Sequence, residues 1–312
     1  GGRRVWAAGL AAFFGFIGFY ALLTPALWRE PLAFFRYLVE NALDFSRWKN
    51  YVRFRGQTYL LGKDRLPRIY LPYMIAATTP LWVLFLCAAG QLGALKSWKK
   101  GIGRSDRALG LLLCTLLWLL PLGAAVAAGA TVYNGWRHFY FLYGPMLVLA
   151  AYGLHGLYRL MAGKRLARRL LTVLLSLCMA LTGVGIVTQH PYQYAYEQPL
   201  VRLLTGQDDL ERDYWNVSVL NALETLAGQT DGEIVIAPAD LWAQAGLENA
   251  LYVMEPGLRE RFSMAEEPDG EEYVLSNPTY TLFSGWEPSE EQEEAVIIRA
   301  YGRTLMRIDR HR

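Results

Sequence analysis

The chain has 312 residues, a formal net charge of +3 and 53% hydrophobic residues, yet its mean hydropathy is only +0.15. So small a charge gives no argument for nucleic-acid binding. High hydrophobic content with so moderate a mean indicates two unlike parts, within a length that permits two domains. The cysteines, Cys87, Cys114 and Cys178, are odd in number and wrongly spaced for zinc, so neither a disulfide framework nor a metal cluster is predicted.

Apolar runs dominate the first part of the chain, and each is close to the ~20 residues that a helix needs to cross a bilayer. The predicted spans are residues 5–23, 69–89, 108–130, 139–160 and 170–187. Ionisable side chains inside them are limited to His155 and Arg159, near one end of the fourth span. A proton-coupled transporter or an ion channel would place such groups near the middle of the membrane, so the sequence disfavours both.

The distribution of Lys and Arg predicts an orientation. The short connections after the second and fourth spans are rich in basic residues, which favours a cytoplasmic location for them. The turn at residues 133–138 and the whole segment 188–312 would then lie outside. The longer loop 24–68 also carries Lys and Arg and weakens this bias. We expect a multi-pass protein of the cell membrane with an extracytoplasmic C-terminal domain.

Loop 24–68 is expected to lie on the outer membrane surface. From Pro31 to Leu43, apolar residues recur at helical spacing, which predicts an amphipathic helix lying in the interface. A basic and aromatic mixture follows, in which Arg53, Arg55 and Lys63 are candidate phosphate-binding residues. The pattern fits a helix clamped to lipid headgroups as well as it fits a substrate-binding surface.

Residues 188–312 are predicted to form a small α/β domain. Strands are expected at 233–237 and 272–276, helices at 217–227 and 239–251, and a terminal hairpin from 295–300 and 304–309. Common nucleotide-binding, metalloprotease and hydrolase motifs do not occur. The predicted fold is therefore a polytopic α-helical membrane protein of about five transmembrane helices (1–187), followed by a small extracytoplasmic α/β domain.

The segment Tyr133–Pro145 is a tight turn between two spans, and Asn134-Gly135 is its turn signal. It places Arg137 and His138 at headgroup level, where they could bind the phosphate of a ligand whose apolar tail lies in lipid. Arg137 could equally extend to ordinary phospholipid. His138 could merely bond the backbone, and Tyr133 could belong to an interfacial aromatic belt.

Several motifs give a family resemblance. The run Tyr-Asn-Gly-Trp-Arg-His-Phe-Tyr-Phe at 133–141, followed by Pro145, resembles the YDGxRHFxF…P segment of bacterial family 39 glycosyltransferases. These are the protein-mannosyltransferase-like members of the glycosyltransferase C superfamily. His-Pro-Tyr-Gln-Tyr at 190–194 and Asp-Tyr-Trp-Asn-Val-Ser at 213–218 are similar to the HPYxY…DYWxxS segment of that group. Asn134 stands where the family usually has Asp.

The resemblance implies transfer of a sugar from a polyprenyl-phosphate donor to an acceptor at the outer membrane face. The donor phosphate would be held by cations, and the acceptor would be a lipid, a protein or a glycan. Besides the cations, possible substrate contacts are Tyr133, Asn134, His190, Tyr192, Asp213, Tyr214 and Trp215. Asp213 could instead cap the helix that follows it. No cofactor is expected, and metal dependence stays open.

The acidic catalytic motif of the family lies in its first outer loop and has no counterpart here. Glu30, Glu40, Asp44 and Asp64 occupy a later loop and do not match it. We therefore expect this chain to be the C-terminal portion of such an enzyme, with the catalytic base upstream. The alternative is a non-enzymatic, membrane-anchored receptor or assembly protein whose outer α/β domain binds a partner.

Overall fold

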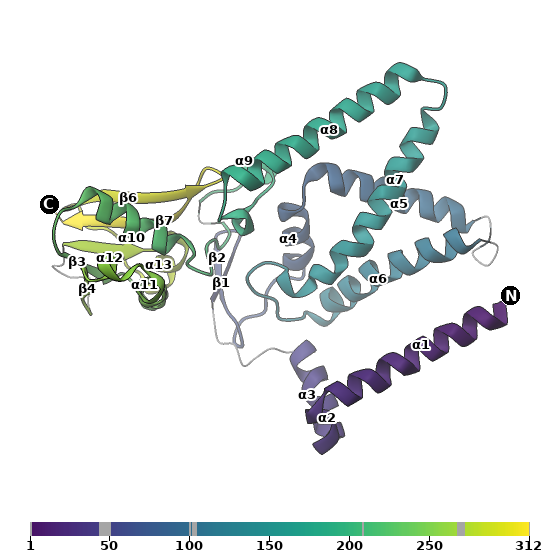
Figure 1. Cartoon of the computed structure of the whole chain (residues 1–312), viewed down its shortest axis with the longest axis horizontal. Coiled ribbons are helices and arrows are strands. Elements are labelled where there is room, and N and C mark those ends of the chain that lie inside the picture. The colour runs from purple at the N-terminus through teal and green to yellow at the C-terminus, as the bar shows by residue number, and fades with distance from the viewer. Residues whose placement is uncertain are drawn as a thin grey trace.

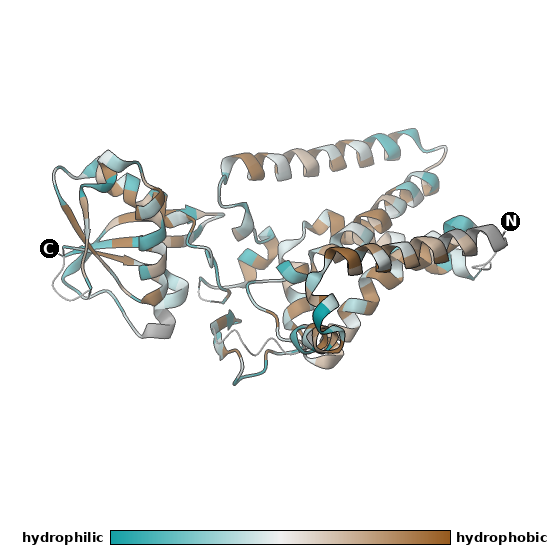
Figure 2. Ribbon diagram, turned by 60° about the horizontal axis from the view of Figure 1, so that its bottom comes forward, coloured by the Kyte–Doolittle hydropathy of each residue, from teal (hydrophilic) through white to brown (hydrophobic). Residues whose placement is uncertain are grey.

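The structure is a computed structural model, which describes residues 2–43, 51–99, 101, 105–207, 209–266 and 272–311. Long helices form one part of the molecule and a mixed sheet with its helices forms the other (Figure 1). Hydrophobic residues run along the long helices, whereas hydrophilic and hydrophobic residues alternate in the sheet region (Figure 2). This division agrees with the two unlike parts expected from the composition.

Four helical segments are long and apolar enough to cross a membrane. They are α5 (Leu81–Trp98), α6 (Asp106–Ala128), the segment Arg137–Leu160 that ends in α7 (Tyr143–Leu160), and α8 (Arg165–Thr188). The predicted first span lies in α1 (Gly2–Leu23), whose apolar part Gly9–Leu23 is shorter. Three of the predicted spans thus agree with candidate spans by length and composition, whereas α5 overlaps only the last part of the predicted span 69–89.

The predicted span 69–89 is not one helix. It divides into α4 (Tyr70–Thr78) and the start of α5, with Thr79 in an extended conformation (φ −99°, ψ 132°). Pro80 is the cause, because proline disfavours helical geometry in the residue before it and has no N–H for the helix. The break makes α4 a short helix, which lies against the turn at residues 134–136.

Helices α5 and α7 cross at unusually close range. A Cβ atom on Gly90 would lie 1.8 Å from the carbonyl oxygen of Leu149, and one on Gly153 would lie 2.1 Å from the carbonyl oxygen of Leu86. Only glycine leaves room for this approach of two backbones, as in other tightly packed membrane helices. The contact fixes α7 relative to α5.

The loop 24–68 contains more structure than the sequence predicts. Helices α2 (Pro25–Arg29) and α3 (Pro31–Leu43) include the predicted amphipathic helix, which begins at Pro31. An antiparallel hairpin of β1 (Tyr51–Phe54) and β2 (Gln57–Leu60) was not predicted. Part of the predicted basic segment, residues 44–50 with Asp44, lies outside the described residues.

The C-terminal region is a five-stranded mixed sheet in the order β4-β3-β5-β7-β6. The strands are β3 (Ile234–Pro238), β4 (Phe262–Met264), β5 (Tyr273–Ser276), β6 (Gln292–Ala300) and β7 (Arg303–His311). Strand β3 is parallel to β4 and β5, and β7 is antiparallel to β5 and β6. The predicted strands and terminal hairpin are confirmed, while β4 was not predicted.

Helices α10 (Ser218–Gln229) and α11 (Leu241–Val253) confirm the two predicted helices and pack on the sheet. The core between α10 and the strands contains Leu223, Leu226, Ile236 and Ile308, all buried. The shorter helices are α9 (Pro199–Leu204), α12 (Pro256–Arg259) and α13 (Pro278–Ser284).

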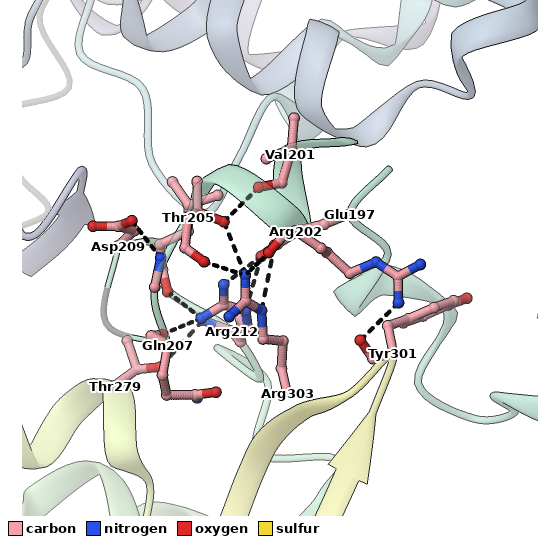
Figure 3. Close-up of polar contacts among 12 residues, drawn as sticks. Glu197, Val201, Arg202, Thr205, Gln207, Asp209, Arg212, Thr279, Tyr301 and Arg303 are labelled. Carbon is pink, nitrogen blue, oxygen red and sulfur yellow. Dashed lines mark hydrogen bonds and ion pairs between the residues drawn. The ribbon is translucent and has the colours of Figure 1, made fainter. Parts of the chain in front are cut away.

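A buried polar cluster joins the segment after α8 to the sheet region (Figure 3). Arg212 forms an ion pair with Glu197, with 2.7 Å between Nη2 and Oε1, and both side chains are almost fully buried. Arg303 on β7 lies 3.9 Å from the other Glu197 oxygen and donates to the backbone oxygens of Arg202 and Thr205. The cluster holds Glu197, Arg202 and Thr205 against β7.

Candidate functional site

The site begins at the turn between α6 and α7. Asn134 and Gly135 have positive φ angles of 52° and 74°, as the predicted turn requires. The Gly135 N–H donates to the Tyr70 hydroxyl at 3.1 Å, and Trp136 Nε1 donates to Thr78 Oγ1 at 2.8 Å. Both acceptors belong to α4, so the turn is fixed on that helix and the 3₁₀ helix η2 (Arg137–Leu142) starts in a defined position.

Aromatic rings surround the guanidinium of Arg137. Its Cζ atom lies 4.9 Å from the ring centre of Tyr133, 5.5 Å from that of Tyr214 and 4.9 Å from that of Trp215. Such cation–π contacts contribute about 0.5–2 kcal/mol each. Tyr133 belongs to the turn between α6 and α7, whereas Tyr214 and Trp215 precede α10 of the sheet region. The two halves of the chain therefore build this arrangement together.

The Arg137 side chain is only half-buried, and no carboxylate of a described residue lies within 4 Å of it. The guanidinium carbon lies among three aromatic rings, which do not accept strong hydrogen bonds from its N–H groups. A planar guanidinium with accessible N–H groups can bind phosphate oxygens in pairs. The geometry therefore suits an anionic ligand.

An apolar cavity of about 540 Å³ adjoins the turn. His138 and Tyr133 line it together with Pro121, Ala124, Phe139 and Phe141. The rings of His138 and Tyr133 are 4.8 Å apart, so Tyr133 lies between the cavity and Arg137. A cation and a space for an apolar group are thus separated by one aromatic side chain.

Glu211 is the residue of this region that sequence reasoning missed. It is buried and lines a small cavity of about 50 Å³ with Asn134, Asp213 and Tyr214. Burial raises the pKa of its carboxyl to about 8, although the backbone N–H groups of Arg53 and Asn134 and the charge of Arg137 act in the opposite direction. Neither carboxyl oxygen makes a hydrogen bond of normal geometry to a described residue.

The only sequence signal for Glu211 is its position two residues before Asp213-Tyr214-Trp215. From the sequence, an acidic residue beside a turn is expected to be exposed to solvent. The isolated bridge between Phe54 at the end of β1 and Leu210 brings a distant hairpin beside Glu211, and the backbone of Arg53 approaches its carboxyl group.

Asp213 caps α10, which is the structural alternative that the sequence left open. Its carboxylate accepts from the backbone N–H of Val217 at 2.8 Å and of Ser218 at 3.2 Å, and also from the hydroxyls of Ser218 and Tyr194. These hydrogen bonds lower the pKa of the carboxyl, but burial outweighs them and the pKa is raised. The role of Asp213 is to hold Tyr214 and Trp215 at the start of the helix.

Two other predicted contacts lie away from Arg137. Tyr192 is buried in the core of the sheet region, where its hydroxyl accepts from Asn221 Nδ2 at 2.8 Å. His190 is exposed at the end of α8, and its Nδ1 is 3.0 Å from Gln193 Nε2. Neither residue lines the cavities around Glu211 or His138.

The predicted cations of the outer loop lie on or beside the β1–β2 hairpin. Arg53 Nη1 donates to Thr58 Oγ1 across the hairpin at 2.8 Å. Arg55 is exposed at its turn with a φ of 51°, and Lys63 is exposed in the turn after β2. The Arg53 backbone lies near Glu211. The side chains of Arg53, Arg55 and Lys63, however, do not reach the aromatic rings around Arg137.

Within the described part of the chain, no three His, Cys, Asp or Glu side chains form a group that could hold a metal ion. The site therefore contains Arg137 among aromatic rings, His138 beside an apolar cavity, and the buried carboxyl group of Glu211. Comparison of the chain with protein-family models, with curated proteins and with solved structures found no match.

Proposed function

We propose that this chain is part of a membrane glycosyltransferase that transfers a sugar from a polyprenyl-phosphate-linked donor to an acceptor at the outer membrane face. The observation that supports it is the position of Arg137, whose guanidinium carbon lies among aromatic rings beside an apolar cavity of about 540 Å³. The guanidinium would bind the phosphate, and the cavity would receive the first part of the polyprenyl chain.

Arg137 suits the chemistry of such a transfer. The acceptor hydroxyl gives its proton to a base and its oxygen forms a bond to the anomeric carbon, while the bond from that carbon to the phosphate oxygen breaks with its electron pair on the phosphate. A fixed guanidinium at that oxygen stabilises the charge that develops in the transition state. The cation–π contacts hold Arg137 in place before the ligand binds, which lowers the entropic cost of binding.

We assign the acceptor base to no described residue. Glu211 has the required chemistry, but the cavity that it lines, at about 50 Å³, has room for a water molecule and not for a sugar or lipid acceptor. Its contribution to the site must therefore be indirect.

A second candidate function is partner binding by the sheet region. Helix α11 exposes Leu241, Tyr252 and Val253, which are 76%, 81% and 65% accessible. Exposed apolar side chains on one helix favour a protein interface there. This function would not need Arg137, so a variant at that position separates the two candidates.

The test measures binding of a defined lipid to the complete protein in nanodiscs by native mass spectrometry. Decaprenyl methyl phosphate is a suitable probe because, as a phosphodiester, it carries one negative charge throughout pH 5–10. We expect Arg137→Ala to weaken binding at least tenfold, since it removes a charge-assisted hydrogen-bond donor. Arg159→Ala, at the far end of α7, is the control. Equal affinity of Arg137→Ala and the wild type would refute the proposal.

A further inference from the structure

Glu211 and Arg137 share neighbours without forming an ion pair. Tyr214 lines the cavity of Glu211 and contacts the guanidinium of Arg137, and Asn134 lines the same cavity three residues before Arg137. The charge of Arg137 acts on Glu211 through this enclosed region. No guanidinium nitrogen of Arg137 lies within 4 Å of a carboxyl oxygen of Glu211.

The surroundings of Glu211 contain few other groups that change charge. Tyr214, Tyr70 and Tyr280 face it and interact with it electrostatically, and the backbones of Arg53 and Asn134 approach it. The remaining charged groups that line the cavity already have partners, because Arg212 pairs with Glu197 and Asp213 caps α10. Arg137 is therefore the cation that most directly stabilises an ionised Glu211.

Because Arg137 favours ionisation of Glu211, a negative charge bound at Arg137 must oppose it. We propose that Glu211 controls the affinity of Arg137 for phosphate, by taking up one proton from solvent when an anionic phosphate ligand binds. This inference rests on the proposed phosphate-binding role of Arg137. Glu211 acts through Arg137 and is a positioning residue, with no bond to the ligand.

In the free protein, the carboxyl group of Glu211 changes its protonation state slightly above neutral pH. Since the pKa of Glu211 is about 8, the carboxyl is mostly protonated at pH 7 and mostly ionised at pH 9. A bound phosphate cancels the field of Arg137 and raises the pKa further. A rise of roughly one pKa unit on binding corresponds to a loss of affinity of up to about tenfold at alkaline pH. Linkage then requires weaker binding above pH 8.

The experiment measures the affinity of the full chain in nanodiscs for decaprenyl methyl phosphate between pH 7 and pH 9.5. The charge of this ligand does not change over the range, so any pH dependence comes from the protein. For the wild type we expect roughly a tenfold loss of affinity, and for Glu211→Gln a change of less than twofold. Glu224→Gln, on the exposed face of α10, is the matched control and should follow the wild type.

A second measurement needs no variant. Titration calorimetry at pH 8 in two buffers of different ionisation enthalpy gives the number of protons taken up on binding, and we expect roughly half a proton for the wild type. A pH-independent affinity with no proton uptake would overturn the inference. So would a wild-type pH profile in Glu211→Gln. If Arg137→Ala binds normally, the proposed function itself fails; if Arg137→Ala loses binding and the pH profile is flat, only the role of Glu211 fails.

Discussion

The guanidinium carbon of Arg137 lies 4.9 Å from the ring of Trp215, although Arg137 starts a membrane helix and Trp215 precedes the first helix of the sheet region. This contact crosses the boundary between the two parts of the chain. It orients the cation of the turn between α6 and α7 and joins that turn to the sheet region. The proposed function depends on this relationship.

Removal of Trp215 should weaken anion binding without unfolding the protein. Trp215 is 62% exposed, so its loss leaves no large cavity, but it removes one of the contacts that orient Arg137. A contact of about 1 kcal/mol corresponds to about a fivefold change in affinity. We expect Trp215→Ala to bind decaprenyl methyl phosphate about fivefold less tightly and Trp215→Phe to lie between it and the wild type. Full affinity in Trp215→Ala would show that the ring does not orient Arg137.

Glu211 should make the stability of the protein depend on pH. Its pKa in the folded protein, about 8, is above its ordinary value of 4.5, so the folded state binds more protons than the unfolded state between these values. The free energy of unfolding should therefore fall as pH rises through this window, by at most about 5 kcal/mol. Glu211→Gln stays neutral and should lack this decrease.

Thermal unfolding followed by tryptophan fluorescence in detergent at pH 5, 7 and 9 measures this effect. The melting temperature of Glu211→Gln should exceed that of the wild type at pH 9 and approach it at pH 5. The control Glu224→Gln should show the wild-type pH dependence. A constant difference between Glu211→Gln and the wild type across the three pH values would contradict the prediction.

The crossing of α5 and α7 should tolerate no side chain. Gly90→Ala places a methyl group where only 1.8 Å separates it from the Leu149 oxygen, so the two helices must move apart. Forced overpacking costs about 1–3 kcal/mol. We expect a clear decrease in melting temperature in detergent. Gly156→Ala on the same α7 is the control, because no atom lies within 4 Å of the added methyl group. Similar stability of the two variants would refute the close packing.

The buried ion pair of Arg212 and Glu197 should show strong coupling. Arg212→Met leaves the Glu197 carboxylate with only Arg303 at 3.9 Å, inside a buried cluster. The loss of one member of such a pair costs about 3–5 kcal/mol, whereas loss of both costs less. We therefore expect Arg212→Met to be less stable than Arg212→Met combined with Glu197→Gln, as measured by thermal unfolding. Additive effects in the double variant would show that the pair is not coupled.

Local sequence patterns predicted the elements that depend on local interactions. Hydrophobic runs located the long helices, alternation located β3, and Tyr301-Gly302-Arg303 located the terminal hairpin. The helix from Pro31 and the turn at Asn134 also follow from the conformational preferences of those residues. The break at Pro80 also has a local cause, but the long apolar run led to the prediction of one continuous span.

These local patterns do not predict contacts between segments that are far apart in the sequence. The β1–β2 hairpin has strands of only four residues each, and its bridge to Leu210 joins segments far apart in the sequence. Asp213 remained ambiguous between a ligand contact and a helix cap until its hydrogen bonds to the start of α10 were known.

The sequence by itself determined that this protein has a hydrophobic helical part and an α/β part, and that Arg137 and His138 occupy the turn between two long apolar helices. Hydrophobic periodicity and turn chemistry act over a few residues, so the chain displays them directly. Only the tertiary structure decided that Tyr214 and Trp215 enclose Arg137 and that Glu211 is buried behind them. Burial and electrostatic interaction depend on which distant segments meet, and a carboxyl group has the same identity in the sequence whether water or an apolar core surrounds it.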